Sequence, residues 1–353
     1  MSPDRKIRVL IVDDSAIVRK LLGEALAGTS DIEVVGTAPD PYVARDKILS
    51  LQPDVLTLDI EMPRMDGLTF LKKLMVFHPM PVIIISSLAQ ASCQAGIDAL
   101  RAGAVEAVAK PGGPYSVGEL KFALPNKIRA AAASHVGPRI AAERPREIYT
   151  PAASAGKFNP LGLIAIGAST GGTEAIEEVL THLPAEMPGI VVTQHIPAGF
   201  SRAFAERLNK CCNLRVKEAG DGDAVEPGLA LVAPGNFHMI VRKAGPGYRV
   251  TVKDGPMVCY QRPSVDVLFS SVAEAAGPNA VGVILTGMGS DGAQGMKKMK
   301  SAGASTIAQD EATCVVFGMP KEAIRLGGAG RVVPLQSVAP AILGASVLRQ
   351  STA

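Results

Sequence analysis

The sequence predicts an α/β protein made of two doubly wound parallel-sheet domains, the second of which also contains an antiparallel hairpin. Three observations support this prediction. The chain has 353 residues, which is long for one average domain and suits two. Short apolar runs alternate with amphipathic stretches, as in βαβ units. The alternation fails over residues 126–158, so we expect domains at residues 1–125 and 159–350 with a flexible linker between them.

In the first domain, β-rich runs and helix-like stretches alternate regularly. The expected strands are Ile7–Val12, Ile32–Thr37, Val55–Leu58, Val82–Ser86 and Ala107–Ala109. The expected helices are Ile17–Leu26, Tyr42–Leu49, Thr69–Val76 and Ile97–Arg101. Near-continuous apolar runs of this length are typical of parallel strands that are buried on both faces.

The second domain repeats this pattern and adds a hairpin. The expected strands are Leu163–Gly167, Ile190–Thr193, Leu214–Glu218, Leu229–Val232 and Val281–Thr286. The expected helices are Thr173–Leu183, Arg202–Asn209, Val265–Ala275 and Ala293–Ala302. His238–Lys243 and Tyr248–Lys253 flank the sequence AGPG, which indicates two antiparallel strands joined by a turn.

Composition excludes several classes of function. A net charge of +3 provides no basic surface for nucleic acid or anionic membrane. No apolar run approaches the roughly 20 residues of a membrane span, and the first residues do not resemble a signal peptide. The five cysteines show no C-x-x-C spacing, so we expect neither a disulfide framework nor a zinc site, and Cys211-Cys212 receives no role. We therefore expect a cytoplasmic protein that binds no nucleic acid and does not insert into membranes.

Charged residues follow three strands of the first predicted sheet. Asp13 and Asp14 come after the first strand, Asp59 after the third and Lys110 after the fifth. The carboxyl ends of parallel strands meet at one edge, where such sheets bind ligands. Clustered carboxylates repel one another unless a hard cation such as Mg²⁺ neutralises them, and a carboxylate beside that cation can accept a phosphoryl group. The alternative is that each Asp is only a turn or cap residue.

The motifs VDDS, LDIEMPRMDG, IIISS and AKP, at these intervals, resemble the receiver domain of two-component response regulators over about residues 6–124. The resemblance implies a flavodoxin-like fold, Asp59 as the phosphoacceptor and a histidine kinase as phosphodonor. It implies a Mg²⁺ site for phosphorylation at Asp13, Asp14, Asp59 and Glu61, where Asp13 is a supporting acid and Glu61 contributes its backbone carbonyl.

The same resemblance implies two residues that respond to the phosphoryl group. Ser86 would be the switch hydroxyl, and Lys110 would be the partner of the phosphate. Ala107 departs from the family pattern, because many receivers carry an aromatic switch residue there. This departure affects the expected signal path and not the expected phosphorylation.

The second domain opens with LIAIGASTGG, an apolar strand followed by small residues and a helix-like stretch. Small residues permit a tight strand-to-helix turn, at which Ser169 would be exposed. The pattern is neither the G-x-S-x-G nucleophile elbow nor the G-x-x-x-x-G-K-[ST] phosphate loop. From these residues alone, the turn could carry a nucleophile, bind a nucleotide or simply allow tight packing.

A nucleophilic serine needs a base and an acid that orients it. His195 ends an apolar strand on the edge expected for Ser169, His238 is the reserve candidate, and His182 is expected in a surface or packing role within a helix. Asp291 follows another strand in a glycine-rich turn whose N–H groups could stabilise an oxyanion. Its alternative role is to cap the helix that begins just after it.

Five motifs, IGASTGG, QHIPAGFS, APGNFHM, RPSVDVLF and LTGMGSDGAQGM, resemble the catalytic domain of the chemotaxis protein-glutamate methylesterases, the CheB family, over about residues 160–345. The resemblance implies Ser169 as nucleophile, His195 as general base and Asp291 as orienting acid. It also implies that Thr170 helps to hold His195 and that the Met288 N–H donates in the oxyanion hole. Its reactions would be hydrolysis of glutamate methyl esters and deamidation of glutamines on methyl-accepting chemoreceptors, with no cofactor for the esterase. The kinase that phosphorylates its receiver would be the chemotaxis histidine kinase.

Three other functions compete with this hypothesis. Many receivers are joined to a DNA-binding module, but residues 160–345 show no short basic trihelical pattern. A regulator without catalysis that only binds receptors is the second, and the presence of Ser169, His195 and Asp291 argues against it. A nucleotide-binding enzyme built on the GASTGG turn is a more distant third.

Overall fold

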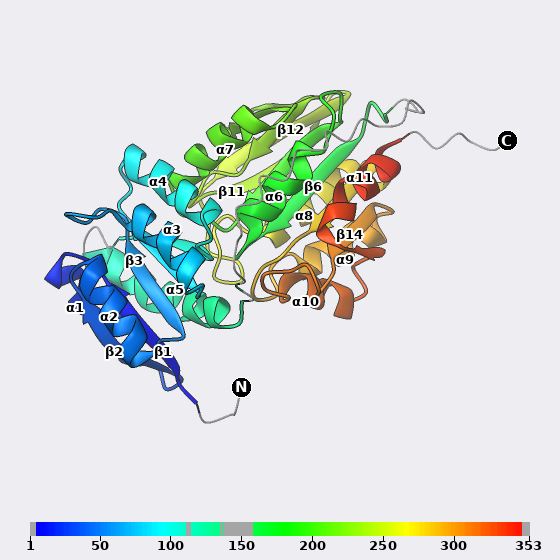
Figure 1. Ribbon diagram of the computed structural model, residues 1–353. Helices are drawn as coiled ribbons and strands as arrows, with labels where there is room; N and C mark the ends of the chain where they lie inside the picture. The colour runs from blue at the N-terminus through cyan, green and yellow to red at the C-terminus, as the bar shows by residue number, and fades with distance from the viewer. Residues whose placement is uncertain (1–4, 111–113, 135, 137–157, 348–353) are drawn as a thin grey trace. The chain divides into compact units, whose positions relative to one another are not determined.

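The chain divides into two compact units, residues 1–143 and 144–353. The computed structural model describes residues 5–110, 114–134, 136 and 158–347, so most of the predicted linker lies outside the described residues. In Figure 1 the first unit runs from blue to blue-green and the second from green to red. Both units are built on parallel sheets, which confirms the predicted fold class. Among the described helices, none has the length and apolar character needed to cross a membrane.

The first unit is a five-stranded sheet in the order β2-β1-β3-β4-β5, and every neighbouring pair is parallel. Its strands are β1 (Ile7–Val12), β2 (Ile32–Ala38), β3 (Val55–Asp59), β4 (Val82–Ser86) and β5 (Glu106–Ala109). Its helices are α1 (Ala16–Leu26), α2 (Pro41–Leu51), α3 (Gly67–Phe77), α4 (Gln90–Arg101) and α5 (Pro114–Ala132). The strand order reverses at β1 and β3, so their carboxyl ends form the ligand-binding edge of such a sheet.

Local sequence explains where several of these helices begin. Ser15, Asp40 and Asp66 are N-caps whose side chains accept backbone N–H groups of α1, α2 and α3. Helix α5 continues past the predicted boundary at residue 125, because Leu124 and Ile128 form a buried stripe on one face. The sequence pattern was weak there because Pro125 and a run of small residues interrupt it.

Gly67 allows α3 to start directly against β3. A Cβ at this position would lie 1.9 Å from the carbonyl oxygen of Asp59, far inside van der Waals contact. We therefore expect Gly67→Ala to destabilise the first unit by about 3 kcal/mol, measured by chemical unfolding of the full chain. The control is Gly23→Ala in α1, where nothing lies within 4 Å of the added Cβ, and it should stabilise by about 0.5–1 kcal/mol. Equal effects of the two substitutions would contradict this packing.

The second unit contains a seven-stranded parallel sheet in the order β15-β14-β13-β6-β7-β10-β8. Its strands are β6 (Leu163–Ala168), β7 (Gly189–Gln194), β8 (Arg215–Glu218), β10 (Leu229–Val232), β13 (Ala280–Ile284), β14 (Ser305–Gln309) and β15 (Arg331–Val333). The predicted hairpin is β11 (His238–Ala244) with β12 (Gly247–Lys253), and β9 (Ala224–Val225) extends it to three antiparallel strands.

One helix joins the two sheets of this unit. The helices are α6 (Gly172–Thr181), α7 (Phe200–Cys211), α8 (Val265–Ala276), α9 (Ala293–Ser301), α10 (Met319–Arg325) and α11 (Val338–Ser346). Helix α8 contacts β6 of the large sheet and β11 of the small one, and it carries the fully buried Leu268, Phe269 and Val272 into one shared core. This packing fixes the N-terminus of α8 near the carboxyl ends of β6 and β13.

Candidate functional site

The structure brings together the predicted acidic residues of the first unit. Carboxylate oxygens of Asp13, Asp14 and Asp59 lie within 4.8 Å of one another at the carboxyl ends of β1 and β3. Lys110, just after β5, places its Nζ 2.7 Å from Asp59 Oδ2 and 3.2 Å from Asp13 Oδ2. Asp13 and Asp59 are fully buried, whereas Asp14 is exposed.

Three carboxylates and one ammonium leave this pocket with excess negative charge. Burial raises the pKa of Asp59 to about 6, and the neighbouring Asp13 adds to this effect while Lys110 opposes it. Burial also raises the pKa of Asp13, against the opposing charge of Lys110. Burial alone would lower the pKa of Lys110, but its contacts with Asp59 and Asp13 raise it. Oxygen donors with unneutralised charge fit a hard divalent cation such as Mg²⁺.

The other predicted receiver residues surround this pocket. The Glu61 N–H donates to Asp59 Oδ1 at 3.2 Å, while its carboxylate accepts from Ser92 Oγ on α4. Ser86 is fully buried, and its hydroxyl donates to the Ser92 carbonyl at 3.2 Å. The Lys110 N–H donates to the Ser86 carbonyl at 2.7 Å. Ser92, which no sequence motif singled out, therefore connects α4 to β4 and to the loop after β3.

Ser169 lies at the turn between β6 and α6, as predicted. Gly171 has a φ of 75°, which favours glycine, and a Cβ on Gly172 would lie 2.2 Å from Gln194 Oε1. Gln194 in turn donates from Nε2 to the Ser169 carbonyl at 2.8 Å. The two glycines thus allow this turn to pack directly against the end of β7.

His195 follows β7 and lies beside Ser169. The pairing of Ala168 with Gln194 aligns the two strand ends, and the His195 N–H donates to the Ala168 carbonyl at 3.2 Å. The imidazole is buried, and its Nε2 lies 2.8 Å from Asp291 Oδ2. Because a carboxylate can only accept, Nε2 carries the proton and Nδ1 carries the free lone pair in the neutral ring.

The lone pair on His195 Nδ1 has no hydrogen-bond partner among the described residues. No hydrogen bond joins it to the Ser169 hydroxyl in this structure, although the two residues leave neighbouring strands side by side. Catalytic hydrogen bonds are often long in ligand-free sites and shorten when substrate binds. An unpartnered basic nitrogen next to a serine is therefore what a general base requires before the substrate is present.

Asp291 is held as a carboxylate by four donors. Besides His195 Nε2, it accepts Ser264 Oγ at 2.8 Å, the Val265 N–H at 2.7 Å and the Asp266 N–H at 3.0 Å. Burial alone would raise the pKa of Asp291, but His195 and these donors lower it below its usual value.

These contacts show which helix Asp291 caps. Helix α9 begins after Gly292 without a side-chain cap, so Asp291 does not cap the helix that follows it in sequence. It caps the first turn of α8 instead, where the positive end of the helix dipole favours a negative charge.

Thr170 follows β6 and Met288 follows β13, at the carboxyl ends of these two neighbouring strands. Thr170 is buried, and its carbonyl accepts the Thr286 hydroxyl at 3.0 Å. Met288 lies on the loop after β13, where a Cβ on the preceding Gly287 would lie 2.6 Å from Ser169 Cβ. This close approach places the backbone before Met288 against the serine. The roles of Thr170 and Met288 remain predictions.

The other two histidines considered for the second unit, His238 and His182, form contacts elsewhere. His238 Nε2 lies 2.9 Å from the Pro256 carbonyl, and its Nδ1 accepts the Ser264 N–H at 3.3 Å. His182 follows α6, with its Nδ1 2.6 Å from the Glu178 carbonyl. His195 is the histidine that the structure pairs with Asp291.

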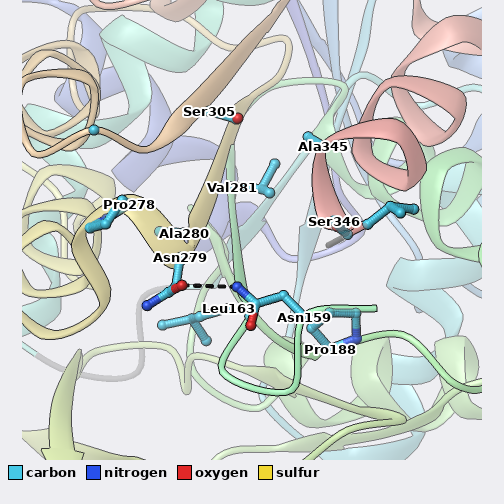
Figure 2. A pocket seen from close by; sticks show the side chains of 13 residues that line it. Asn159, Leu163, Pro188, Pro278, Asn279, Ala280, Val281, Ser305, Ala345 and Ser346 are labelled. Carbon is cyan, nitrogen blue, oxygen red and sulfur yellow. Dashed lines mark hydrogen bonds between the residues drawn. The ribbon is translucent and has the colours of Figure 1, made fainter. Parts of the chain in front are cut away.

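A cavity of about 280 Å³ lies away from these residues. Figure 2 shows it at the first residues of the large sheet's strands, including Leu163, Ala280 and Ser305, with a hydrogen bond of 2.9 Å from Asn159 Nδ2 to Asn279 Oδ1. Because the strands are parallel, their amino ends lie at the edge opposite Ser169 and His195. This cavity is therefore separate from the candidate active site.

Comparison with known proteins gives two family matches along the chain. The model of the response regulator receiver domain matches residues 9–119, and that of the CheB methylesterase matches residues 164–342. A relative from Syntrophus aciditrophicus, named protein-glutamate methylesterase/protein-glutamine glutaminase 2, is 56% identical over 96% of this chain and 98% of its own length. The chain belongs to the CheB methylesterase family.

Further relatives support the assignment to the CheB family across both units. The Salmonella typhimurium protein-glutamate methylesterase/protein-glutamine glutaminase is 54% identical over 96% of each chain. Among solved structures, the CheB methylesterase catalytic domain of Thermotoga maritima has 38% identity and a TM-score of 0.51, and it covers 52% of this chain and 97% of its own.

Sequence reasoning missed one important member of the CheB site. Ser264 is the N-cap of α8 and donates to Asp291, so it connects the helix terminus to the candidate triad. A serine directly before the apolar period of residues 265–275 is the signal that predicts an N-cap. Nothing local indicates that this helix terminus faces Asp291, which is 27 residues away.

Proposed function

We propose that this chain is a phosphorylation-activated hydrolase of the bacterial chemotaxis pathway. It removes methyl groups from glutamate methyl esters of methyl-accepting chemoreceptors and deamidates specific receptor glutamines, which mediates adaptation. The observation that carries this proposal is the buried His195–Asp291 pair beside Ser169 at the ends of neighbouring parallel strands. The names of its relatives describe the same two activities.

The geometry supports an acyl-enzyme mechanism. His195 Nδ1 removes the Ser169 hydroxyl proton, and the oxygen attacks the γ-carbonyl carbon of the ester. The backbone N–H of Met288 donates to the oxyanion, and the proton on His195 passes to the departing methanol oxygen. Water, deprotonated by His195, then attacks the acyl-enzyme and releases the glutamate carboxylate and the free serine. With glutamine, ammonia leaves in place of methanol.

Asp291 supports both steps without changing protonation state. Its low pKa keeps it ionised, so it stabilises the imidazolium that forms when His195 accepts the serine proton. Its contacts with the first turn of α8 fix the carboxylate, and the carboxylate fixes the Nε2–H tautomer of the ring.

The first unit supplies the control. Asp59 would accept the phosphoryl group from a histidine kinase, and Lys110 would neutralise charge that the phosphoryl group adds. Asp14, Asp59, the Glu61 carbonyl and the supporting Asp13 would hold Mg²⁺, which neutralises charge during phosphoryl transfer. Ser86 would exchange its bond to the Ser92 carbonyl for one to the phosphoryl oxygen, which changes the contact between β4 and α4. We place these reactions in the cytoplasm.

Phosphorylation provides a test of this proposal. Release of labelled methanol from methylated chemoreceptor membranes should rise when the full chain receives a small-molecule phosphodonor with Mg²⁺. Asp59→Asn should keep the unstimulated rate and lose the increase, because an amide cannot form the acyl phosphate. Chelation of Mg²⁺ should remove the increase from the wild-type protein. A stimulated Asp59→Asn protein, or no methanol release by the wild type, would contradict the proposal.

A further inference from the structure

A tight turn beside Asp291 has side chains at two positions that usually favour glycine. Val258 and Gln261 exchange both backbone hydrogen bonds, at 3.1 and 2.9 Å, so Cys259 and Tyr260 are the central residues of a two-residue hairpin turn. Their φ angles are 51° and 61°, the left-handed region. Such turns strongly prefer Asn and Gly, because other residues are strained there.

The turn lies at the edge of the candidate active site. The sulfur of Cys259 lies within 4.8 Å of carboxylate oxygens of Asp266 and Asp291. Asp291 is the partner of His195, so the Cys259 side chain adjoins the candidate triad. Tyr260 is the next residue along the chain. All of these residues belong to the second unit.

Arg262 holds this turn in place. Its guanidinium donates to the Asp254 carboxylate, to the Gly255 carbonyl at 2.6 Å and to Asn236 Oδ1 at 2.7 Å. The Asn236 N–H in turn donates to the Arg262 carbonyl at 3.1 Å. The loop that carries Tyr260 is thereby joined to the loop between β10 and β11.

The side chain of Tyr260 is 80% exposed. In the second unit, the described residues include six large apolar side chains that are exposed, and four of them lie on the three loops at this edge. These four are Phe237, Met257, Tyr260 and Met288, and the other two are Leu161 and Val332. Apolar side chains gathered at one edge indicate a contact surface for another molecule.

We propose that Tyr260 is a substrate-contacting residue, which binds the protein segment flanking the esterified glutamate. This inference rests on the proposed function, because the ester is then carried by a polypeptide and the enzyme must contact more than the ester group. Phe237, Met257 and Met288 extend the same apolar rim. The strain at residue 260 supports the proposal: Gly would relax the backbone, and the exposed ring adds little packing within the chain.

The test compares a receptor substrate with a small ester that cannot reach the rim. Tyr260→Gly in the full chain should lower kcat/KM for methylated chemoreceptor membranes by about tenfold, mainly through a higher KM. Its rate on a small activated ester should stay within about twofold, and its Tm should be equal or higher. Tyr260→Phe should retain the receptor activity, because it keeps the apolar ring. Leu161→Ala is the control, since Leu161 is 45% exposed and precedes the amino end of β6.

Three results would overturn this inference. One is an equal loss on both substrates with a lower Tm, which a structural role of Tyr260 would produce. Another is unchanged receptor activity in Tyr260→Gly. A receptor-specific loss in Leu161→Ala as large as that in Tyr260→Gly is the third. If the wild-type protein acts on neither substrate, the proposed function fails and this inference fails with it. If the wild type acts on both, the comparison of the variants tests the role of Tyr260 alone.

Discussion

Ser169→Ala is expected to reduce ester hydrolysis on the order of 10⁶-fold, on receptors and on small esters alike. The substitution removes the hydroxyl whose oxygen attacks the ester. It leaves the turn intact, because Ser169 uses only its own backbone N–H and carbonyl in its hydrogen bonds with Thr286, Gly172 and the Gln194 side chain. The variant should therefore keep the Tm of the parent, and steady-state rates together with thermal unfolding measure both expectations.

Ser290→Ala is the matched control for Ser169→Ala. Ser290 lies on the loop after β13 and is exposed, so it provides a second serine at the same edge. We expect its rate to remain within a few fold of the parent. Comparable losses in the two variants would show that Ser169 has no special role and would contradict the mechanism.

Asp291→Asn is expected to have the second large effect, on rate and on stability together. The rate should fall by about 10³–10⁴-fold, because the amide no longer fixes the Nε2–H tautomer of His195 or stabilises its protonated form. The free energy of unfolding should fall by about 3 kcal/mol, since the new NH₂ group faces donors that now bond a carboxylate. Urea unfolding at pH 7 measures the second effect.

Because the pKa of Asp291 is lowered in the parent, the stability difference between the parent and Asp291→Asn should depend on pH. A carboxyl group with a lowered folded-state pKa stabilises the fold above its ordinary value of 3.8, and this stabilisation is lost as pH falls through the lower folded value. The stability difference between the parent and Asp291→Asn should therefore shrink below about pH 4. A difference that is constant from pH 7 to pH 3 would contradict the role of the ionised carboxylate.

Ser264→Ala tests whether the hydrogen bonds to Asp291 contribute to stability, to the reaction rate or to both. It removes one of the four donors to Asp291 and the N-cap of α8, but it leaves the carboxylate and His195 in place. We expect a loss of about 1 kcal/mol in unfolding free energy and a rate within tenfold of the parent. A rate as low as that of Asp291→Asn would assign Ser264 a direct part in catalysis.

Much of the fold could be predicted because buried parallel strands are continuous apolar runs. The predicted bounds of Ile7–Val12, Val82–Ser86 and Leu229–Val232 agree with the structure for this reason. The elements that were missed are short or weakly patterned. Strand β15 has three residues, two of them exposed, and α10 has seven residues with Pro320 at its start, so neither shows a clear period.

Of the two candidate sites, one could be predicted from local sequence more completely than the other. The convergence of Asp13, Asp59 and Lys110 could be predicted because all three follow strands of one parallel sheet. The pairing of Asp291 with the first turn of α8 could not, because it depends on how α8 packs between two sheets. Local sequence indicated a cap at Asp291 and assigned it to the wrong helix.

Ser169 is the proposed nucleophile, and the most direct test of this role is to identify the residue that becomes acylated. The full chain would be mixed with an activated ester, quenched in acid during turnover and digested for peptide mass spectrometry. We expect the acyl group on Ser169, with none at this position in Ser169→Ala and slower formation in His195→Ala. An adduct on the thiol of Cys259, which lies beside Asp291, that persists in Ser169→Ala and accounts for turnover would contradict this role of Ser169.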